Sequence, residues 1–347
     1  MKRSSKRFVS VMIVLAFVAA GGWAVWKYRL GKSVAPVGPV DDSKVAVMQP
    51  VVSPAPAPAP SKPVPPPAMP ATQPATAPAP SAVPPDINES FSRGMTLMQA
   101  GKLLEARADL SRALLSGRLE TQQEEQAVRS LGDLADRTIF GPEMIEGDPY
   151  TFLYTFKSGE VLARVERSLK LHVPPQMMLK INGLREANDI RAGQSLKLIN
   201  GPFHAIVYKS KFRMDLFLQR DDQPPVFVKR LTVGLGRDGS TPVGQWRVAF
   251  GKKLHHAPWN PPPSSTFHGA IQWGEPNYPL GTEGYWISLE GMDDATRRFD
   301  GYGIHGTNDP ASIGKAASLG CVRLSDPDID FVYSLLYEKW STVEVRP

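Results

Sequence analysis

Cysteine is scarce in this chain: Cys321 is the only one among 347 residues, so no intrachain disulfide can form. Histidine is also scarce, with six residues, and none of their spacings matches a zinc-binding pattern. Adjacent histidines in a strand, such as His255 and His256, should point to opposite faces. A metal site built from these two with His268, His305 and Cys321 is therefore a disfavoured alternative. No metal and no cofactor are expected.

Acidic residues are absent from residues 1–34, which hold seven of the 40 basic residues. The rest of the chain carries 33 basic against 34 acidic residues, and its basic residues do not cluster. A nucleic-acid-binding surface would need such a cluster on the folded part, so this class is excluded. The early cations instead flank Phe8–Trp26, a run without charge. At about 1.5 Å per residue it would span about 28 Å, close to a bilayer's hydrocarbon core.

Residues 1–34 are therefore predicted to form a cytoplasmic tip and a transmembrane signal anchor. The cations before the apolar run keep the N-terminus in the cytoplasm. This places the remaining chain in the cell envelope, on the periplasmic side of the inner (cytoplasmic) membrane. A cleaved signal peptide is the alternative, because "AAGGW" offers small residues for cleavage. In an exported protein a lone thiol is open to oxidation, which favours a use for Cys321.

Two segments precede any β-rich pattern. Residues 35–86 are rich in proline and alanine, and this composition predicts a semi-rigid polyproline linker. Residues 87–146 are predicted to form a small helical module. Small and apolar residues follow a spacing similar to that of a tetratricopeptide hairpin, namely Gly94, Gly101, Ala106, Leu110 and Ala113. Plain helical packing without a partner is the favoured interpretation of this TPR-like module.

Residues 150–200 are predicted to be a βααβ unit with helices over 161–169 and 175–181. Its stretches "SGEVL", "INGL" and "NDIRAGQSLKL" resemble a LysM domain, a module that binds N-acetylglucosamine-containing glycans. The resemblance covers the unit from Tyr154 to Leu198. It implies a peptidoglycan-binding groove between two loops, formed by Ser158, Gly159, Glu160, Asn188, Asp189 and Ile190. The alternative is that these loops merely close the fold.

Residues 203–347 carry many short apolar or alternating runs broken by Gly, Pro and Asp, as in "HAIVYKS", "MDLFLQ" and "VFVKRLTVGLG". They predict a mainly β domain, sandwich-like or barrel-like, with little helix. One helix is predicted in "DPDIDFVYSLLYEKW", N-capped by Asp326 with Pro327 at its first position. The whole chain is thus expected to be a multidomain α+β protein.

Cys321 lies in "SLGCVRL", 16 residues after His305. A thiolate is a nucleophile, and a nearby base or cation activates it. Backbone N–H groups at a glycine bend can bind an oxyanion. Arg323 is two residues further on and would share the face of Cys321 in an extended strand, where it could hold a substrate carboxylate. The pattern predicts acyl transfer through a thioester.

The stretches "IHGT", residues 304–307, and "SLGCVR", residues 318–323, resemble the paired motifs of the L,D-transpeptidase catalytic domain of the YkuD type. "STPVGQW", "PWNPPP" and "YWISL" follow in that family's order. The resemblance implies Cys321 as nucleophile, His305 as base and the Gly306 carbonyl as its orienting group. It also implies an oxyanion hole at the N–H groups of Gly320 and Cys321, with the site lined by Ser318, Thr307 and Arg323.

Leu319 departs from the family pattern, because many members have histidine at this position. The resemblance therefore does not imply how the side chains at the rim of the site are arranged. The resemblance further implies action on peptidoglycan stem peptides in cell-wall biogenesis and cell-shape maintenance, and inhibition by carbapenem-type compounds. L,D-carboxypeptidase or D-amino-acid exchange activity at the same site is an alternative. A non-catalytic peptidoglycan-binding protein is a second alternative, which the presence of both His305 and Cys321 disfavours. A papain-like protease is a third alternative, and it would need its cysteine at the start of a long helix early in the domain. Cys321 instead lies late in the domain, among short predicted strands, which disfavours this alternative.

Overall fold

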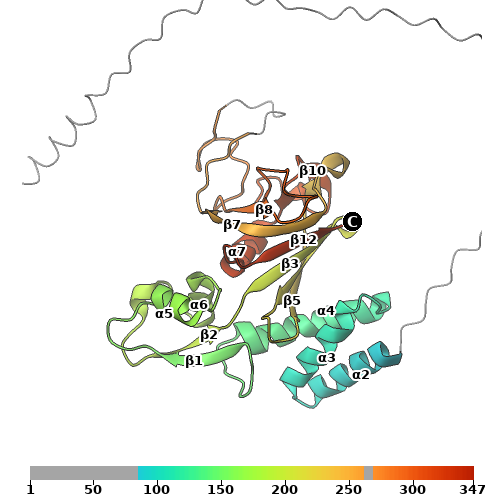
Figure 1. The fold of residues 1–347 in the computed structure, drawn as a ribbon, viewed down its shortest axis with the longest axis vertical. Helices are drawn as coiled ribbons and strands as arrows, with labels where there is room; N and C mark the ends of the chain where they lie inside the picture. Colours follow the sequence, from blue (N-terminus) through green and yellow to red (C-terminus); the bar gives the residue numbers. More distant parts are fainter. Residues whose placement is uncertain (1–84, 262–268) are drawn as a thin grey trace, which may run out of the picture. The chain divides into compact units, whose positions relative to one another are not determined.

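The computed structural model describes residues 85–261 and 269–347 (Figure 1). Within these ranges no helix combines the length and apolar character needed to cross a bilayer. The predicted anchor, nearly all of the predicted linker, and His268 lie outside the described residues.

Three helices open the described chain: α2 (Pro85–Gln99), α3 (Leu103–Leu115) and α4 (Thr121–Ala135), the last continued by a π-helical turn at Asp136–Phe140. The α2 and α3 helices approach closely at Gly94, where a Cβ atom would lie 2.7 Å from Cγ of Leu110. A glycine is therefore required at this crossing. The helices agree with the helical pattern of residues 87–146, while the TPR-like identity stays a prediction.

The next unit follows the predicted βααβ order. It contains β1 (Thr151–Thr155), α5 (Leu162–Leu169), α6 (Pro175–Ile181), a 3₁₀ turn (Ala187–Asp189) and β2 (Ser195–Ile199). The two strands pair antiparallel, with Thr151 opposite Ile199. Apolar side chains of both helices are buried against them, Leu162 and Met178 completely. The LysM identity of this unit stays a prediction.

The remaining residues form an eight-stranded mixed sheet in the order β11-β9-β8-β7-β12-β3-β4-β5. Its strands are β3 (Phe203–Tyr208), β4 (Arg213–Leu218), β5 (Val226–Thr232), β7 (Gly244–Leu254), β8 (Trp286–Gly291), β9 (Gly303–His305), β11 (Val322–Arg323) and β12 (Thr342–Arg346). A separate two-stranded sheet pairs β6 (Leu235–Gly236) with β10 (Ala316–Ser318). The prediction of a mainly β domain is confirmed.

The prediction of a sandwich-like arrangement is wrong, because eight of the strands belong to one curled sheet whose two edges meet. Gly234, just beyond edge strand β5, exchanges two backbone hydrogen bonds of 2.9 and 2.8 Å with Arg323 of the opposite edge strand β11. Strand patterns in a sequence give no information on such long-range closure. The seam that results carries Arg323.

One further helix, α7 (Asp326–Leu335), packs against the sheet. Its N-cap is Ser325, whose hydroxyl accepts from the N–H of Asp328, so the prediction of Asp326 as N-cap is wrong by one residue. Asp326 is the first helical residue, and its carboxylate instead accepts from the N–H of Thr282 at 3.1 Å. This contact ties the helix start to the loop before β8.

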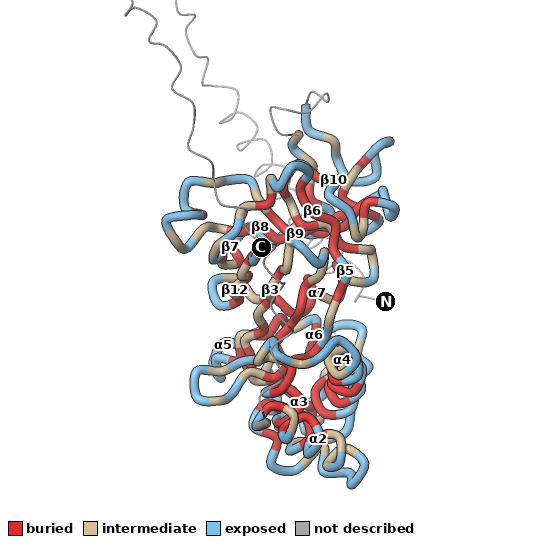
Figure 2. The backbone as a smooth tube through the Cα atoms, turned by 90° about the vertical axis from the view of Figure 1, so that its right-hand side faces the viewer, coloured by how far each residue is buried: buried red, intermediate tan, exposed pale blue. Residues whose placement is uncertain are grey.

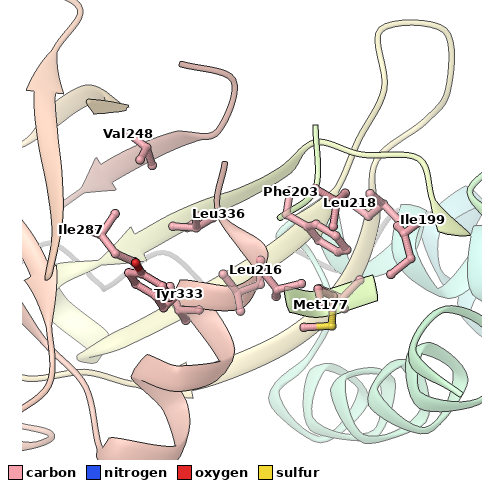
Figure 3. Close-up of a cluster of buried hydrophobic side chains, with 14 of the residues drawn as sticks. Met177, Ile199, Phe203, Leu216, Leu218, Val248, Ile287, Tyr333 and Leu336 are labelled. Atoms are coloured by element: carbon pink, nitrogen blue, oxygen red, sulfur yellow. The ribbon is translucent and has the colours of Figure 1, made fainter. Parts of the chain in front are cut away.

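A single apolar cluster runs from the βααβ unit into the sheet and α7 (Figure 3). Met177 and Ile199 lie at one end, near Phe203 and Leu218. Val248, Ile287, Tyr333 and Leu336 continue the same cluster under the sheet. Figure 2 shows the buried segments following the strands and the inward faces of the helices. The βααβ unit therefore shares its core with the β domain.

Candidate active site

Strand register brings Cys321 and His305 together. Strands β9 and β11 are parallel neighbours, with Ile304 opposite Val322 and His305 opposite Arg323. Ile304 and Val322 are buried in the core, at 0% and 2% exposure. Because side chains alternate along a strand, His305, Cys321 and Arg323 share the other face. Two residues 16 positions apart in the sequence thus become diagonal neighbours.

The turn before Cys321 is held by hydroxyl groups. Ser318 Oγ donates to the carbonyl of Cys321 at 2.7 Å. Thr241 Oγ1 donates to the carbonyl of Gly320 at 2.9 Å and accepts from the N–H of Gly236 at 2.8 Å. Gly320 has a φ of +136°, and a Cβ there would lie 2.6 Å from Cε1 of Tyr302. Glycine is required at this position, and Ser318 supports the turn.

The Gly320 N–H does not face an empty oxyanion site in this structure. It donates to Ser318 Oγ at 3.0 Å. Its implied role as an oxyanion donor stays a prediction, and in this structure its hydrogen bond closes the turn. The sequence does not reveal this bond, because it depends on the backbone conformation of the turn.

His305 is buried, at 7% exposure, and fixed on two sides. Its Nδ1 lies 2.6 Å from the carbonyl oxygen of Gly306, which can only accept, so Nδ1 carries the proton and Nε2 is the free base. The indole of Trp286 stacks on the imidazole at 5.3 Å with an interplanar angle of 13°. Burial lowers the pKa of His305 to about 4, with the Arg323 charge acting in the same direction against the Gly306 hydrogen bond. The imidazole is therefore neutral near pH 7.

Cys321 is partly exposed, and its sulfur lies 3.8 Å from the carbonyl oxygen of Gly301. Burial raises the pKa of its thiol to about 11, against smaller opposing effects of a backbone hydrogen bond from Gly303 and the charge of Arg323. The resting pair consists of a thiol and a neutral imidazole. Attack on a carbonyl must therefore be accompanied by proton transfer from Sγ to Nε2 of His305.

Arg323 supplies the positive charge of the site. Its Nε is buried and has no hydrogen-bond partner among the described residues. Burial lowers the pKa of the guanidinium, although it remains a cation at any ordinary pH. The charge of the guanidinium, on the same face as Cys321, suits an anionic substrate group. Thr307, by contrast, is buried and accepts from the N–H of Asp309 at 3.1 Å, so it shapes the turn after β9.

The predicted glycan-binding residues lie in two loops. Glu160 accepts from the N–H of Lys157 at 2.9 Å and from the Tyr154 hydroxyl at 3.0 Å, and the first of these bonds lowers the pKa of its carboxyl most. Ser158 and Gly159 form the exposed turn before it. In the second loop, Asn188 and Asp189 line a shallow hollow of about 770 Å³, whereas Ile190, which follows them, does not. The first loop does not contribute to that lining.

Four functional positions were missed by sequence reasoning: Thr241, Trp286, Tyr302 and Gly303. Thr241 lies in "STPVGQW" and Trp286 in "YWISL", so both motifs were noticed without a role. Tyr302 and Gly303 precede "IHGT" directly. Their contacts depend on which strands pair, and the local pattern does not contain that information.

His255 and His256 do not point to opposite faces, which corrects the sequence argument. Strand β7 ends at Leu254, and His256 has a left-handed φ of 53°, so the alternation of a strand does not apply. Their ring centroids lie 3.9 Å apart, and both Nε2 atoms face Glu283. These three residues, among those the structure describes, could hold a metal ion.

Comparison with known proteins agrees with this geometry. Residues 202–345 match the family model described as the L,D-transpeptidase catalytic domain. The chain is 39% identical over 183 residues to the protein named L,D-transpeptidase YkuD of Bacillus subtilis (strain 168), covering 51% of this chain and 88% of the relative. The chain belongs to this family. A second YkuD protein, from Bacillus licheniformis, is 28% identical over 180 residues, again covering 51% of this chain and 88% of the relative.

A solved L,D-transpeptidase with lower sequence identity also matches. L,D-transpeptidase 3 from Mycobacterium tuberculosis, in complex with a faropenem-derived adduct, aligns at 14% identity with a TM-score of 0.30. The alignment covers 45% of this chain and 65% of that chain, just under two thirds of its length. Cys321, His305 and Arg323 all lie within residues 202–345, which match the L,D-transpeptidase catalytic domain. Because the chain carries this catalytic domain, the protein is an enzyme.

Proposed function

We propose that the protein cross-links peptidoglycan stem peptides through a thioester on Cys321. The observation that carries this proposal is the register of β9 and β11, which sets Cys321 beside a histidine whose free nitrogen is Nε2. Neutral thiol and neutral imidazole are the protonation states that general-base activation requires.

In the first step, Sγ of Cys321 attacks the carbonyl carbon of the L-centred third stem residue while Nε2 of His305 takes the thiol proton. The C–N bond to the following D-amino acid then breaks, and the leaving amine takes that proton from Nε2. The thioester remains on Cys321. In the second step, an acceptor amine attacks the thioester and gives a proton to Nε2. The amide forms, and the proton returns to the departing thiolate.

Stabilisation of the oxyanion falls first to the N–H of Cys321. The Gly320 N–H can join it only by leaving Ser318 Oγ, because one hydrogen is shared between the two acceptors. Arg323 adds a positive charge on the same face and holds a carboxylate of the stem peptide. Electrostatic stabilisation of this kind accounts for about 2.7–4 kcal/mol per donor in acyl-transfer enzymes.

The other parts of the chain serve to deliver the enzyme to its polymer. The βααβ unit, as a LysM domain, binds glycan strands through the loops at residues 158–160 and 188–190. Residues 1–34 anchor the chain in the inner membrane, and residues 35–86 give reach across the periplasm. Binding of the unit to the same polymer raises the effective concentration of stem peptides at Cys321.

Incubation with disaccharide-tetrapeptide, read by mass spectrometry, tests the proposal. A dimer that lacks one D-amino acid is expected from the wild type and from His204→Gln, a control distant from the nucleophile. Cys321→Ala and His305→Gln should form little or none. A disaccharide-tripeptide alone would assign an L,D-carboxypeptidase, incorporation of an added free D-amino acid an exchange enzyme, and unchanged substrate would overturn the enzymatic role.

Glycan binding is tested separately. Full-length Cys321→Ala should co-sediment with purified peptidoglycan, and Asn188→Ala with Asp189→Ala should reduce the bound fraction. Equal sedimentation of both proteins would contradict a role for that loop.

A further inference from the structure

Three polar side chains meet at the two ends of the long connection between β7 and β8. His255 and His256 follow β7 directly, and Glu283 lies three residues before β8. Nε2 of His255 lies 3.2 Å and Nε2 of His256 lies 3.9 Å from the same carboxylate oxygen, Oε2 of Glu283. One ligand atom from each residue lies within 4.8 Å of the others.

These separations match a tetrahedral metal site. Zinc binds imidazole nitrogen at about 2.0–2.1 Å and carboxylate oxygen at about 2.0–2.2 Å. At a tetrahedral angle such bonds place neighbouring ligand atoms about 3.3–3.5 Å apart. The values of 3.2 and 3.9 Å bracket that spacing, so small side-chain rotations suffice.

The imidazoles are held by aromatic neighbours, which limits the freedom lost on binding an ion. The His256 ring stacks on Trp273 at 3.5 Å and 17°, and the His255 ring stacks on Tyr285 at 4.6 Å and 20°. Trp273 is itself fixed by a hydrogen bond of 2.9 Å from Nε1 to the carbonyl of Thr282. The ring orientations therefore come from the surrounding structure.

Backbone hydrogen bonds fix the two segments against each other. The N–H of His256 donates to the carbonyl of Glu283 at 3.3 Å, and the N–H of Ala257 donates to the carbonyl of Gly284 at 3.0 Å. The three side chains remain open to solvent, with 39%, 41% and 50% exposure. An ion can enter from solvent, and water can complete its coordination.

We propose that His255, His256 and Glu283 form a binding site for a divalent transition-metal ion of the zinc type. Two imidazoles and one carboxylate suit borderline ions such as Zn²⁺, Co²⁺ and Ni²⁺, whereas Mg²⁺ and Ca²⁺ prefer oxygen ligands. The ion clips together the two ends of the 255–285 connection. Glu283 is followed three residues later by Trp286, whose ring stacks on His305, so the clip braces the segment that supports the catalytic base.

The test uses the full chain with Cys321→Ala, because the thiol and His305 could otherwise bind the probe. After EDTA treatment and dialysis, calorimetric titration with Zn²⁺ should show one ion per chain and a rise in melting temperature. His255→Ala and Glu283→Gln should each weaken binding by about tenfold or more. His172→Ala is the matched control, since His172 is also a stacked histidine, against Trp340 at 3.8 Å, and it should bind as the parent does.

A variant with altered folding is recognised by its melting temperature in EDTA, which should equal that of the parent. His256→Asn provides a second route, because asparagine tolerates the left-handed backbone of that position. Co²⁺ bound to the parent should show the intense visible bands of four-coordinate cobalt, and His256→Asn should lose them. Absence of saturable binding, equal affinity in all variants, or a Co²⁺ spectrum like that of the aqueous ion would overturn the proposal.

Discussion

At the scale of single residues, the catalytic pair rests in an uncharged state. Burial acts on both partners in the direction that disfavours charge, holding the pKa of the His305 imidazole low and that of the Cys321 thiol high. The pair therefore differs from a preformed thiolate–imidazolium ion pair. Nucleophilicity appears only when a substrate carbonyl is in place and the proton moves to Nε2.

This state predicts a low intrinsic thiol reactivity at neutral pH. With a thiol pKa of about 11 instead of the ordinary 9, the thiolate fraction at pH 7 falls roughly a hundredfold. Alkylation of Cys321 by iodoacetamide should be correspondingly slow at pH 7 and should accelerate up to about pH 11, as followed by intact mass. A plateau already at pH 7–8 would show an ion pair and contradict the neutral state.

Enzymatic acylation should have a different pH profile. His305 is lost as a base when pH falls through its pKa of about 4, because a protonated imidazole cannot accept the thiol proton. The acylation rate by a carbapenem should therefore be flat from about pH 6 to 8 and should decline only toward pH 4. A decline centred near pH 6.5 would indicate an imidazole with an ordinary pKa.

Thr241 stabilises the turn before Cys321, although it lies outside the two motifs at residues 304–307 and 318–323. Thr241→Val keeps the shape of the side chain but leaves the Gly236 N–H and the Gly320 carbonyl without their partner. We expect a loss of about 1–3 kcal/mol in the free energy of unfolding and slower acylation of Cys321. Thr232→Val, an exposed threonine on β5, is the control and should change neither quantity. Chemical denaturation measures the free energy of unfolding, and intact-mass kinetics measure the acylation rate. If Thr241→Val and Thr232→Val gave the same values of both, the proposed role of Thr241 would be contradicted.

For single residues, the sequence predicted the candidate catalytic side chains but not their local hydrogen-bond partners. Glycine-framed motifs identified Cys321 and His305, because chemistry restricts which residue types can stand there. They did not reveal that the Ser318 hydroxyl takes the Gly320 N–H, or that His255 and His256 face one carboxylate. Both depend on backbone conformation at one residue, and His256 adopts a left-handed φ that a strand pattern does not predict.

At the scale of elements, helix α2 depends on Gly94 to approach α3. Gly94→Ala would place Cβ 2.7 Å from Cγ and 3.1 Å from the backbone nitrogen of Leu110. Overpacking of this kind costs about 1–3 kcal/mol, which exceeds the gain of up to about 1 kcal/mol from better helix propensity. The melting temperature should fall.

Gly132→Ala in α4 is the matched control for this helix contact. Apart from the backbone of the helix itself and the adjoining residues, no atom of the described residues lies within 4 Å of a Cβ at Gly132, so only the propensity gain applies and the melting temperature should rise. Thermal denaturation of both variants decides the point. An increase in both would show that the α2–α3 crossing tolerates a side chain.

Elements with a clear period were predictable, as the helices over 162–169 and 175–181 show. The topology of the sheet was not. A run such as "VFVKRLT" indicates a strand, but it does not state that the chain beyond it will join β11 at Arg323. Closure of the curled sheet depends on backbone hydrogen bonds between residues about 90 positions apart, which a local sequence pattern cannot predict.

At the scale of the whole molecule, buried polar contacts join the helical module to the βααβ unit. Arg107 of α3 makes two hydrogen bonds, of 2.8 and 3.0 Å, to Asp148 in the short segment between the two units, with both side chains almost fully buried. Lys197 of β2 donates to the carbonyls of Thr138, Gly141 and Glu143 at 2.7–2.8 Å. The two units therefore share their stability, and residues 85–347 are expected to unfold without a separate early transition.

Asp148→Asn tests this coupling. Removing one partner of a buried ion pair leaves Arg107 uncompensated and typically costs about 3–5 kcal/mol. Glu125→Gln, which removes an exposed ion pair with Arg129 in α4, is the control and should barely change the melting temperature. The expected result by calorimetry is a single transition shifted down in Asp148→Asn. A new low-temperature transition with an unchanged main one would show independent units.

The most direct test of the catalytic assignment is the intact mass of the protein during reaction with a disaccharide-tetrapeptide donor whose acceptor amine is blocked by acetylation, so that no second stem peptide can resolve the thioester. The wild type should gain the mass of the donor minus the leaving D-amino acid, held as a thioester that hydroxylamine removes. Cys321→Ala should gain nothing, and His305→Gln should acylate about 10²- to 10⁴-fold more slowly. Acylation of Cys321→Ala, or turnover by a wild type that never carries the added mass, would contradict Cys321 as the nucleophile.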